Sequence, residues 1–334
     1  MSRIAILGGG SWGTALAILL SRTRESHQIS IWVHDAALAG TMRETRENGK
    51  YLPGQEIPAD VSVFSDLREA LRDAEIIVGA MPAAHAREIY AAAIPYLKNT
   101  IAIVSATKGL EPATHARMSE VIAQTVAQRV EATISVLSGP SFAVEAARGE
   151  PTAVVLACED DAIAQAFQGH FASPTLRLYT NRDVIGVEMA GATKNVIAIA
   201  AGVCQGLGLG TNTLAALITR GLAEMTRLAV ALGAQPSTLN GLAGLGDLVL
   251  TCTGALSRNR HVGIELGKGR SLEAILGEMK MVAEGVGTAA ALLALARERR
   301  IELPITEQVN AILYQGTAPA AAMREIMERP QKSE

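Results

Sequence analysis

The sequence predicts an α/β unit built on a doubly wound parallel sheet, followed by an all-helical unit. In the first half of the chain, short apolar runs alternate with helical segments, which is the pattern of a parallel sheet with crossover helices. A glycine-rich turn joins the first of these runs to the first helix. After Asp183 the pattern becomes almost entirely helical. We therefore expect one domain over residues 1–184 and a second over residues 185–334.

Length and composition place the chain among globular proteins. Its 334 residues are enough for two domains with a large core, and 49% of the residues are hydrophobic while 19% are charged. Aromatic residues make up 3%, whereas alanine and glycine are abundant, so we expect closely packed helices and not stacking platforms for bases. The formal net charge of −3 and the lack of a basic cluster argue against a nucleic-acid partner.

The cysteines and the longest uncharged span bear on the location of the protein. Cys158, Cys204 and Cys252 lie far apart, without the spacing of a metal site, so we expect no bound metal and a reduced cytosol. Residues 195–219 carry no charge and are numerous enough to cross a bilayer. Polar residues and glycines interrupt that span, so we predict a buried helix and turn, no membrane insertion and a cytoplasmic protein.

The glycine-rich turn is the clearest binding motif. A predicted strand at residues 3–7 (RIAIL) leads into a predicted helix at residues 14–20, and Gly8, Gly10 and Gly13 have the spacing G-x-G-x-x-G. The first glycine permits the tight turn, the second lets the backbone approach a pyrophosphate, and the third lets helix and strand pack closely. We interpret the turn as a dinucleotide site; the alternative is a turn that is only structural.

The end of the second predicted strand bears on the choice of cofactor. Residues 29–33 (ISIWV) are followed by His34 and Asp35. An acid at this place binds the ribose 2′-hydroxyl of NAD, whereas a basic group accepts the 2′-phosphate of NADP. The two neighbours favour opposite choices, and we predict NADP(H) with NAD(H) tolerated. The alternative for His34 is a solvated loop residue.

Further strands are predicted along the sheet, at residues 61–64, 76–80, 101–105, 134–137, 152–158 and 176–180. Residues 48–58 are rich in glycine and proline and are predicted as a loop. Lys108 follows the strand at 101–105, so it is carried to the carboxyl edge of the sheet, where the cofactor lies. Residues 138–143 (SGPSFA) cap the next helix, whose N–H groups can hold a substrate oxygen. An ordinary loop lysine and simple turn chemistry are the alternatives.

The helical half is organised around residues 188–204 (EMAGATKNVIAIAAGVC). Gly191, Lys194 and Asn195 share one face of this predicted helix, among Ala, Val and Ile residues. A lone ammonium is costly to bury there unless a partner or substrate compensates for its charge. Asp247 lies in another apolar run and needs a cation, for which Lys194 is the obvious candidate. The alternatives are a lysine that snorkels to the surface and an aspartate that caps the following helix.

A compact anion-binding sequence lies later in the same half, at residues 257–260 (SRNR). An arginine offers a planar fork to phosphate, and asparagine and serine add donors. The alternative is a salt-bridged surface turn. Helices are predicted over residues 219–232 and 288–297. The glycine spacing at residues 202–210 follows no strand, so we predict a break between two helices there and not a second nucleotide site.

The longer motifs resemble those of one family across nearly the whole chain. In order, they are GGGSWGTALA, ATKGLE, SGPSFAVE, GATKNVIAIAAG, TRGLAEM, GLAGLGDLVLTCTGALSRNR, VAEGV and LPITEQV. The sequence is similar to the NAD(P)-dependent glycerol-3-phosphate dehydrogenases, most of all to their bacterial cytoplasmic branch. The resemblance implies an N-terminal Rossmann domain and an all-helical C-terminal domain like that of 6-phosphogluconate dehydrogenase. It also implies interconversion of sn-glycerol 3-phosphate and dihydroxyacetone phosphate, which supplies the backbone of phospholipids.

The resemblance further implies roles for single residues. Lys194 would be the general acid and base, with Lys108 and Asp247 as catalytic partners. Substrate contacts are implied at Lys108, Gly139, Ser141, Asn195, Asp247, Ser257, Arg258 and Asn259. Cofactor contacts are implied at Gly8, Gly10, Ser11, Trp12, Gly13, His34, Lys108, Ala143, Arg258, Val282 and Glu284. We expect Trp12 to act through its backbone or by stacking.

Two other functions are compatible with the same two-domain plan. One is a related dehydrogenase of hydroxyacids, and the other is a non-catalytic dinucleotide sensor. A sensor would not need Lys194, Asp247 and Arg258 together, so their joint presence argues against it. We expect a small phosphorylated substrate and, because the C-terminal helices are apolar, a homodimer.

Overall fold

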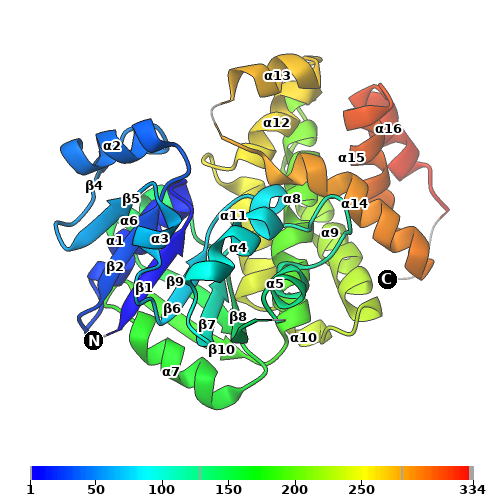
Figure 1. The fold of residues 1–334 in the computed structure, drawn as a ribbon. Coiled ribbons are helices and arrows are strands. Elements are labelled where there is room, and N and C mark those ends of the chain that lie inside the picture. The colour runs from blue at the N-terminus through cyan, green and yellow to red at the C-terminus, as the bar shows by residue number, and fades with distance from the viewer. Residues whose placement is uncertain (1, 128, 280, 331–334) are drawn as a thin grey trace. The chain divides into compact units, whose positions relative to one another are not determined.

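The computed structural model describes residues 2–127, 129–279 and 281–330. The chain divides into two compact units, each of which is treated by itself below. The sheet unit comprises Met1–Glu111 and Ala116–Glu188, and the helical unit comprises Pro112–His115 and Met189–Glu334. Figure 1 shows the strands in the blue-to-green part of the chain and helices in the yellow-to-red part.

The sheet unit is built on an eight-stranded sheet. The strand order is β10-β9-β8-β7-β6-β1-β2-β5. The bounds are β1 Arg3–Leu7, β2 Gln28–Trp32, β5 Val61–Phe64, β6 Ile76–Gly79, β7 Thr100–Ser105, β8 Glu131–Ser138, β9 Thr152–Ala157 and β10 Leu176–Asn181. All the predicted sheet strands are therefore present. From β1 the chain moves outward to β2 and β5 and then returns to β6, so the switch point at which ligands bind lies at β1 and β6.

One junction departs from the parallel arrangement that the sequence predicts. β9 runs antiparallel to β8, whereas the other neighbours in this sheet pair in parallel. The helix between them, α6 (Ala143–Arg148), has 6 residues. It rises only about 9 Å, which is much less than the roughly 20 Å length of a six-residue strand. The chain therefore enters β9 from the edge at which it left β8.

Helices cover both faces of the sheet because its strands are apolar on both sides. Alternate residues of β1 point to opposite faces: Ile4 and Ile6 join one buried cluster, and Ala5 and Leu7 join the other. α1, α2, α6 and α7 supply the first cluster, and α3, α4 and α5 supply the second. The remaining bounds are α1 Ser11–Ser21, α2 Ala36–Thr45, α3 Leu67–Ala70, η1 Ala83–His85, α4 Ala86–Ala93, η2 Ile94–Tyr96, α5 Met118–Val126 and α7 Asp161–Phe171.

The segment predicted as a loop at residues 48–58 contains a hairpin. β3 (Glu47–Asn48) pairs antiparallel with β4 (Leu52–Glu56). The β4 sequence, LPGQE, contains proline and glycine, both of which are rare inside strands, so local propensity favours a loop. Burial overrides that propensity, because Leu52 is fully buried in a small cluster with Ala15 and Ile18 of α1.

The helical unit contains the remaining helices. Their bounds are α8 Val184–Gly206, α9 Thr211–Ala231, α10 Pro236–Leu239, η3 Leu242–Gly246, α11 Asp247–Thr253, α12 Arg258–Gly267, α13 Leu272–Glu278, α14 Glu284–Arg299, α15 Pro304–Tyr314 and α16 Pro319–Met327. The predicted break within residues 202–210 is confirmed, because α8 ends at Gly206 and α9 begins at Thr211. By length and composition α8 could cross a membrane, but 83% of its most apolar window is buried inside the structure, as in a core helix.

The first turns of α8 belong to the sheet unit. There the buried carboxylate of Glu188 accepts hydrogen bonds from Arg117 Nη1 at 2.7 Å, from Ser119 N at 2.7 Å and from Ser119 Oγ at 2.6 Å. Burial raises the pKa of this carboxyl, and the Arg117 charge works against that rise. The start of the helix that carries Lys194 is thus fixed to the N-terminus of α5 by a buried carboxyl group with three hydrogen bonds.

Glycines bring α8 and α12 into backbone contact. A Cβ atom added to Gly202 would lie 2.0 Å from the carbonyl oxygen of Arg260, and one added to Gly263 would lie 2.0 Å from that of Ile199. Larger side chains would force the two helices apart. The abundance of small residues therefore has the consequence expected from the composition, which is close helix packing.

Candidate functional site

In the sheet unit, the glycine turn after β1 has the shape of a dinucleotide cradle. Gly8 has φ +128°, and a Cβ atom there would lie 2.6 Å from the carbonyl oxygen of Ala80. A Cβ atom on Gly13 would lie 1.9 Å from the oxygen of Gly8, so α1 and the turn are in contact. A Cβ atom on Gly10, by contrast, would meet nothing within 4 Å. The turn is thus tightly packed at Gly8 and Gly13 and open at Gly10, and it fits a pyrophosphate at the start of α1.

A buried asparagine that the sequence analysis missed holds this turn. Asn48 Nδ2 donates to the carbonyl oxygen of Gly9 at 2.9 Å and to Thr14 Oγ1 at 2.8 Å. Ser11 Oγ donates to the carbonyl oxygen of Tyr51 at 2.7 Å. All three bonds join the glycine loop or the start of α1 to the β3–β4 hairpin and its turn, so this segment fixes the conformation of the loop. The position of an asparagine before a glycine was the available signal, but it indicated only a turn.

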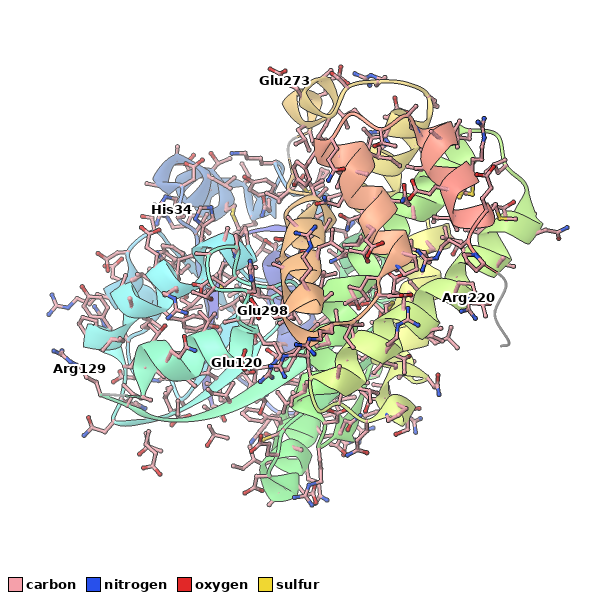
Figure 2. The ribbon with its side chains drawn as sticks, turned by 90° about the vertical axis from the view of Figure 1, so that its right-hand side faces the viewer. His34, Glu120, Arg129, Arg220, Glu273 and Glu298 are labelled. Atoms are coloured by element: carbon pink, nitrogen blue, oxygen red, sulfur yellow. The ribbon has the colours of Figure 1, made fainter. Side chains whose placement is uncertain are left out.

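At the end of β2, the structure separates the roles of the two residues that favoured opposite cofactors. His34 is exposed, beside the start of α2 (Figure 2), and its ring packs edge-on against Trp32 with centroids 5.8 Å apart. The Asp35 carboxylate caps α2 by accepting from Ala37 N and Leu38 N. Lys50 Nζ lies 3.7 Å from Asp35 Oδ2, which adds a cation that the sequence analysis did not identify.

The electrostatics at this corner favour an anion. The hydrogen bond from the Leu38 N–H, aided by Lys50, holds the pKa of the Asp35 carboxyl below its usual value. The carboxylate is therefore already committed to the cap and to Lys50. Beside it, the exposed His34 ring and the Lys50 ammonium can both approach a 2′-phosphate.

Trp12 and Ala143, both predicted cofactor contacts, lie in one place. They are partly buried against a small cluster formed by Ala15, Ile18, Leu52 and Ala147. The Trp12 side chain packs on this core, and its backbone lies in the first turn of α1. Among the described residues, the buried Trp12 Nε1 has no hydrogen-bond partner.

Lys108 meets the SGPS segment, as their shared edge of the sheet predicts. Lys108 Nζ donates to the carbonyl oxygen of Gly139 at 3.1 Å, and Ser141 Oγ donates to the same oxygen at 3.0 Å. Gly139 has φ +140°, and a Cβ atom there would lie 3.0 Å from Val154 Cα, so glycine is required. The half-buried Lys108 side chain is thus positioned next to a hydroxyl and a helix N-terminus.

In the helical unit, Lys194 is buried and paired. Its side chain is 6% exposed, and its Nζ lies 3.2 Å from Asp247 Oδ1. Nζ also donates to Thr251 Oγ1 at 2.7 Å and to Asn195 Oδ1 at 3.4 Å. The expected pairing of Lys194 with Asp247 is present, and neither the snorkelling lysine nor the capping aspartate is observed. Thr251, which sequence reasoning missed, is the closest of these three partners.

A short π-helix positions Asp247. The segment η3 (Leu242–Gly246) closes with a bond from Gly246 N to the carbonyl oxygen of Gly241 at 3.1 Å. A Cβ atom at Gly244 would lie 1.9 Å from the oxygen of Leu239, so this turn also needs glycine. Asp247 then begins α11, one turn before Thr251, whose hydroxyl donates to the Asp247 backbone oxygen at 2.6 Å. Such π-turns are frequent at functional sites.

Two asparagines continue the network from Lys194. Asn259 Nδ2 donates to Asn195 Oδ1 at 2.9 Å, and Asn259 Oδ1 accepts from Gly285 N at 2.9 Å. Both side chains are buried. A Cβ atom on Gly285 would lie 2.7 Å from the Asn195 oxygen, so α14 approaches α8 through a glycine. The network therefore joins α8, α12 and α14 around the lysine.

The remaining predicted residues surround the start of α12. Ser257 caps this helix by accepting from Arg260 N at 3.2 Å. Arg258 Nη1 donates to the carbonyl oxygen of Val282 at 2.7 Å, and both of these residues are exposed. Glu284, which follows Val282 by two positions, is the first residue of α14. One N–H group of the arginine bonds to the described residues, and its guanidinium has further donors that can bind a ligand.

The predicted site residues thus form two groups. The sheet unit contains Gly8, Gly10, Ser11, Trp12, Gly13, His34, Lys108, Gly139, Ser141 and Ala143. The helical unit contains Lys194, Asn195, Asp247, Ser257, Arg258, Asn259, Val282 and Glu284. The first group is suited to holding a dinucleotide, and the second to moving a proton and binding an anion.

Comparisons with known proteins agree along the whole chain. Residues 3–164 match the N-terminal family model of NAD-dependent glycerol-3-phosphate dehydrogenase, and residues 183–324 match the C-terminal model. A glycerol-3-phosphate dehydrogenase [NAD(P)+] of Koribacter versatilis is 51% identical, over 100% of this chain and 99% of its own, and that of Acidobacterium capsulatum is 53% identical over 100% of each. The crystal structure of a glycerol-3-phosphate dehydrogenase from Coxiella burnetii is 38% identical, with a TM-score of 0.94 over 98% of this chain and 99% of that one.

Proposed function

Because this chain belongs to the NAD-dependent glycerol-3-phosphate dehydrogenase family, we propose that Lys194 is the general acid and base of its reaction. The enzyme interconverts sn-glycerol 3-phosphate and dihydroxyacetone phosphate and uses NAD or NADP. The nicotinamide accepts or supplies the hydride. The chain itself must then give a proton to the substrate oxygen during reduction and remove it during oxidation.

The surroundings of Lys194 support this role. An ammonium has three N–H donors, and here they face Thr251 Oγ1 at 2.7 Å, Asp247 Oδ1 at 3.2 Å and Asn195 Oδ1 at 3.4 Å. The third contact is the longest, so a substrate oxygen would replace it at the least cost. Asn195 Oδ1 would keep its bond from Asn259. The observation that carries the proposal is this buried lysine, whose contact with Asn195 is the longest of these three.

We assign the other residues by what their groups can bind. Lys108 adds positive charge for the oxygen that becomes negative during reduction, and Ser141 and Gly139 orient it. Arg258 and Ser257 hold the phosphate of the substrate, and Asn259 has one amide hydrogen left for it. The phosphate grip supplies binding energy that fixes the reacting carbon.

We propose a division of labour between the two halves of the chain and a cellular setting. Residues 1–184 bind the cofactor through Gly8, Gly10, Gly13 and the first turn of α1, and residues 185–334 bind the substrate. Lys50 and His34 favour NADP(H) while NAD(H) is tolerated. The enzyme acts as a homodimer in the cytoplasm and supplies glycerol 3-phosphate for phospholipid synthesis.

The substitution Lys194→Ala tests the central assignment. We expect kcat with dihydroxyacetone phosphate to fall by at least ~10²-fold, the lower end for general acid catalysis, while the Kd for NADPH stays unchanged. Lys268→Ala is the matched control, because that lysine is exposed and pairs with Glu265 on α12. Normal turnover by folded Lys194→Ala protein would show that another group carries the proton.

A further inference from the structure

Three ionisable side chains to which we assign no role in the reaction lie close together near the amino end of β2, in the sheet unit. Glu25 lies between α1 and β2, His27 immediately precedes β2, and His170 lies near the end of α7. One ligand atom from each of the three lies within 4.8 Å of the others. Since His27 stands at the amino end of β2, the cluster is at the edge opposite the carboxyl ends, where the glycine turn lies.

The tautomer of His27 suits a ligand. Its Nε2 lies 3.0 Å from the backbone oxygen of His170. A carbonyl oxygen can only accept, so Nε2 carries a proton, and in the neutral ring Nδ1 then carries a lone pair. The side chain is buried, with the residue 7% exposed, and Nδ1 has no hydrogen-bond partner among the described residues. A histidine that donates one ring N–H to a backbone carbonyl and points the other nitrogen at an ion is the usual arrangement at metal sites.

The other two groups complete a set of donors. His170 Nδ1 lies 2.6 Å from Glu25 Oε2, and the His27 and His170 rings meet edge-on with centroids 5.9 Å apart. The side chains of His170 and Glu25 are 33% and 50% exposed, so water can reach the cluster. Two imidazoles and one carboxylate with room for water match the donors that Zn²⁺ takes in four-coordinate sites.

We propose that Glu25, His27 and His170 bind a Zn²⁺ ion, which ties the segment before β2 to α7. His27 contributes Nδ1, His170 a ring nitrogen and Glu25 its carboxylate, with water in the fourth position. A simple ion pair between His170 and Glu25 accounts for two of the three groups and leaves His27 Nδ1 buried without a partner. The ion accounts for all three.

This inference departs from the expectation, based on the cysteines, that the chain binds no metal. The ligands include no cysteine, and His170 is separated from Glu25 by 145 positions. Short-range ligand spacing, which is the signal in the sequence, cannot detect such a set. The site is independent of the glycerol-3-phosphate reaction, because none of its residues is among those assigned to cofactor or substrate.

Metal binding to the intact chain tests the proposal directly. We would remove bound metal by dialysis against a chelator and titrate the protein with Zn²⁺ by calorimetry, and with Co²⁺ by visible absorption. We expect one ion per chain and the intense d–d bands of four-coordinate Co²⁺. Glu25→Gln and His170→Gln should each weaken Zn²⁺ binding by more than about 100-fold, since even residues outside the ligand set cost roughly 10–100-fold.

Two further measurements make the test decisive. His261→Gln, an exposed histidine on α12, is the matched control and should bind Zn²⁺ like the unchanged protein. Zn²⁺ should slow tryptic cleavage at the exposed Arg24 in the unchanged protein and should not slow it in Glu25→Gln. Absence of Zn²⁺ binding, or equal affinity in Glu25→Gln, His170→Gln and the control, would overturn the proposal.

Discussion

The contacts of Thr251 show how far the proposed role of Lys194 depends on its neighbours. Its hydroxyl is 2.7 Å from Lys194 Nζ, closer than the Asp247 carboxylate, and it also donates to the Asp247 backbone. Thr251→Val keeps the shape and removes the acceptor. We expect kcat to fall by about tenfold, which corresponds to ~1.4 kcal/mol of lost transition-state stabilisation, with the Kd for NADPH unchanged.

Two companions define what the Thr251→Val result means. Thr251→Ser retains a hydroxyl and should recover most of the turnover. Thr253→Val removes a hydroxyl from the exposed side of the same helix, where it bonds only the Val249 backbone oxygen among the described residues, and should leave kcat unchanged. Equal kcat values for Thr251→Val and Thr253→Val would show that Thr251 does not position the lysine.

We expect Lys50 to determine cofactor preference at the far end of the cradle. It pairs with Asp35 at 3.7 Å, and that carboxylate already caps α2. Lys50→Ala removes a cation that a 2′-phosphate would use, so we expect the KM for NADPH to rise while the KM for NADH changes little. Lys98→Ala, an exposed lysine near Glu75, is the control. A parallel rise in both KM values would assign Lys50 to a part of the cofactor that NAD and NADP share.

At the scale of elements, the contact between α8 and α12 fixes the distance between Asn195 and Asn259. Gly263→Ala would gain helix propensity of up to ~1 kcal/mol but would place a Cβ atom 2.0 Å from the Ile199 oxygen. Overpacking of this kind costs typically ~1–3 kcal/mol or more, so the clash should win. We expect a lower Tm and a lower kcat.

Gly277→Ala is the control for this substitution. Gly277 lies in α13, where an added Cβ atom would meet nothing within 4 Å. Alanine there should leave the Tm unchanged or raise it, because only the propensity gain remains. If Gly263→Ala behaved like Gly277→Ala in thermal unfolding, the close approach of α8 and α12 would not be a structural requirement.

At the scale of the molecule, burial should make the thiols of all three cysteines unreactive in the native enzyme. Cys158, Cys204 and Cys252 are free and buried, and burial raises the pKa of Cys204 to about 11 and that of Cys252 to about 12. The thiolate is the reactive form, so neither of these two reacts at neutral pH. We expect no rapid colour with a disulfide reagent in the native enzyme, and three thiols after denaturation. Fast labelling of the native enzyme would mean that the core around at least one of these cysteines opens.

The strands of the sheet could be predicted from the sequence, whereas the residues that hold the site residues in place by hydrogen bonds could not. Both results have the same physical reason. A strand such as β1 is signalled by its own apolar residues and the glycines that follow it, and those signals are local. Asn48 and Thr251 matter because of atoms that lie far away along the chain, at Gly9 and Lys194. The hairpin strand β4 contradicts local propensity and forms because Leu52 finds a buried place.

The number of residues in the π-turn η3 (Leu242–Gly246) decides where the side chains of Asp247 and Thr251 point. Each residue advances a helix by ~100°, so losing one there would swing every side chain of α11 around the axis by more than a quarter turn. Asp247 and Thr251 would leave the lysine together, although neither had been altered. A deletion that removes no charge and little apolar surface would therefore break the contacts of Lys194 with Asp247 and Thr251, the group to which we assign the proton transfer.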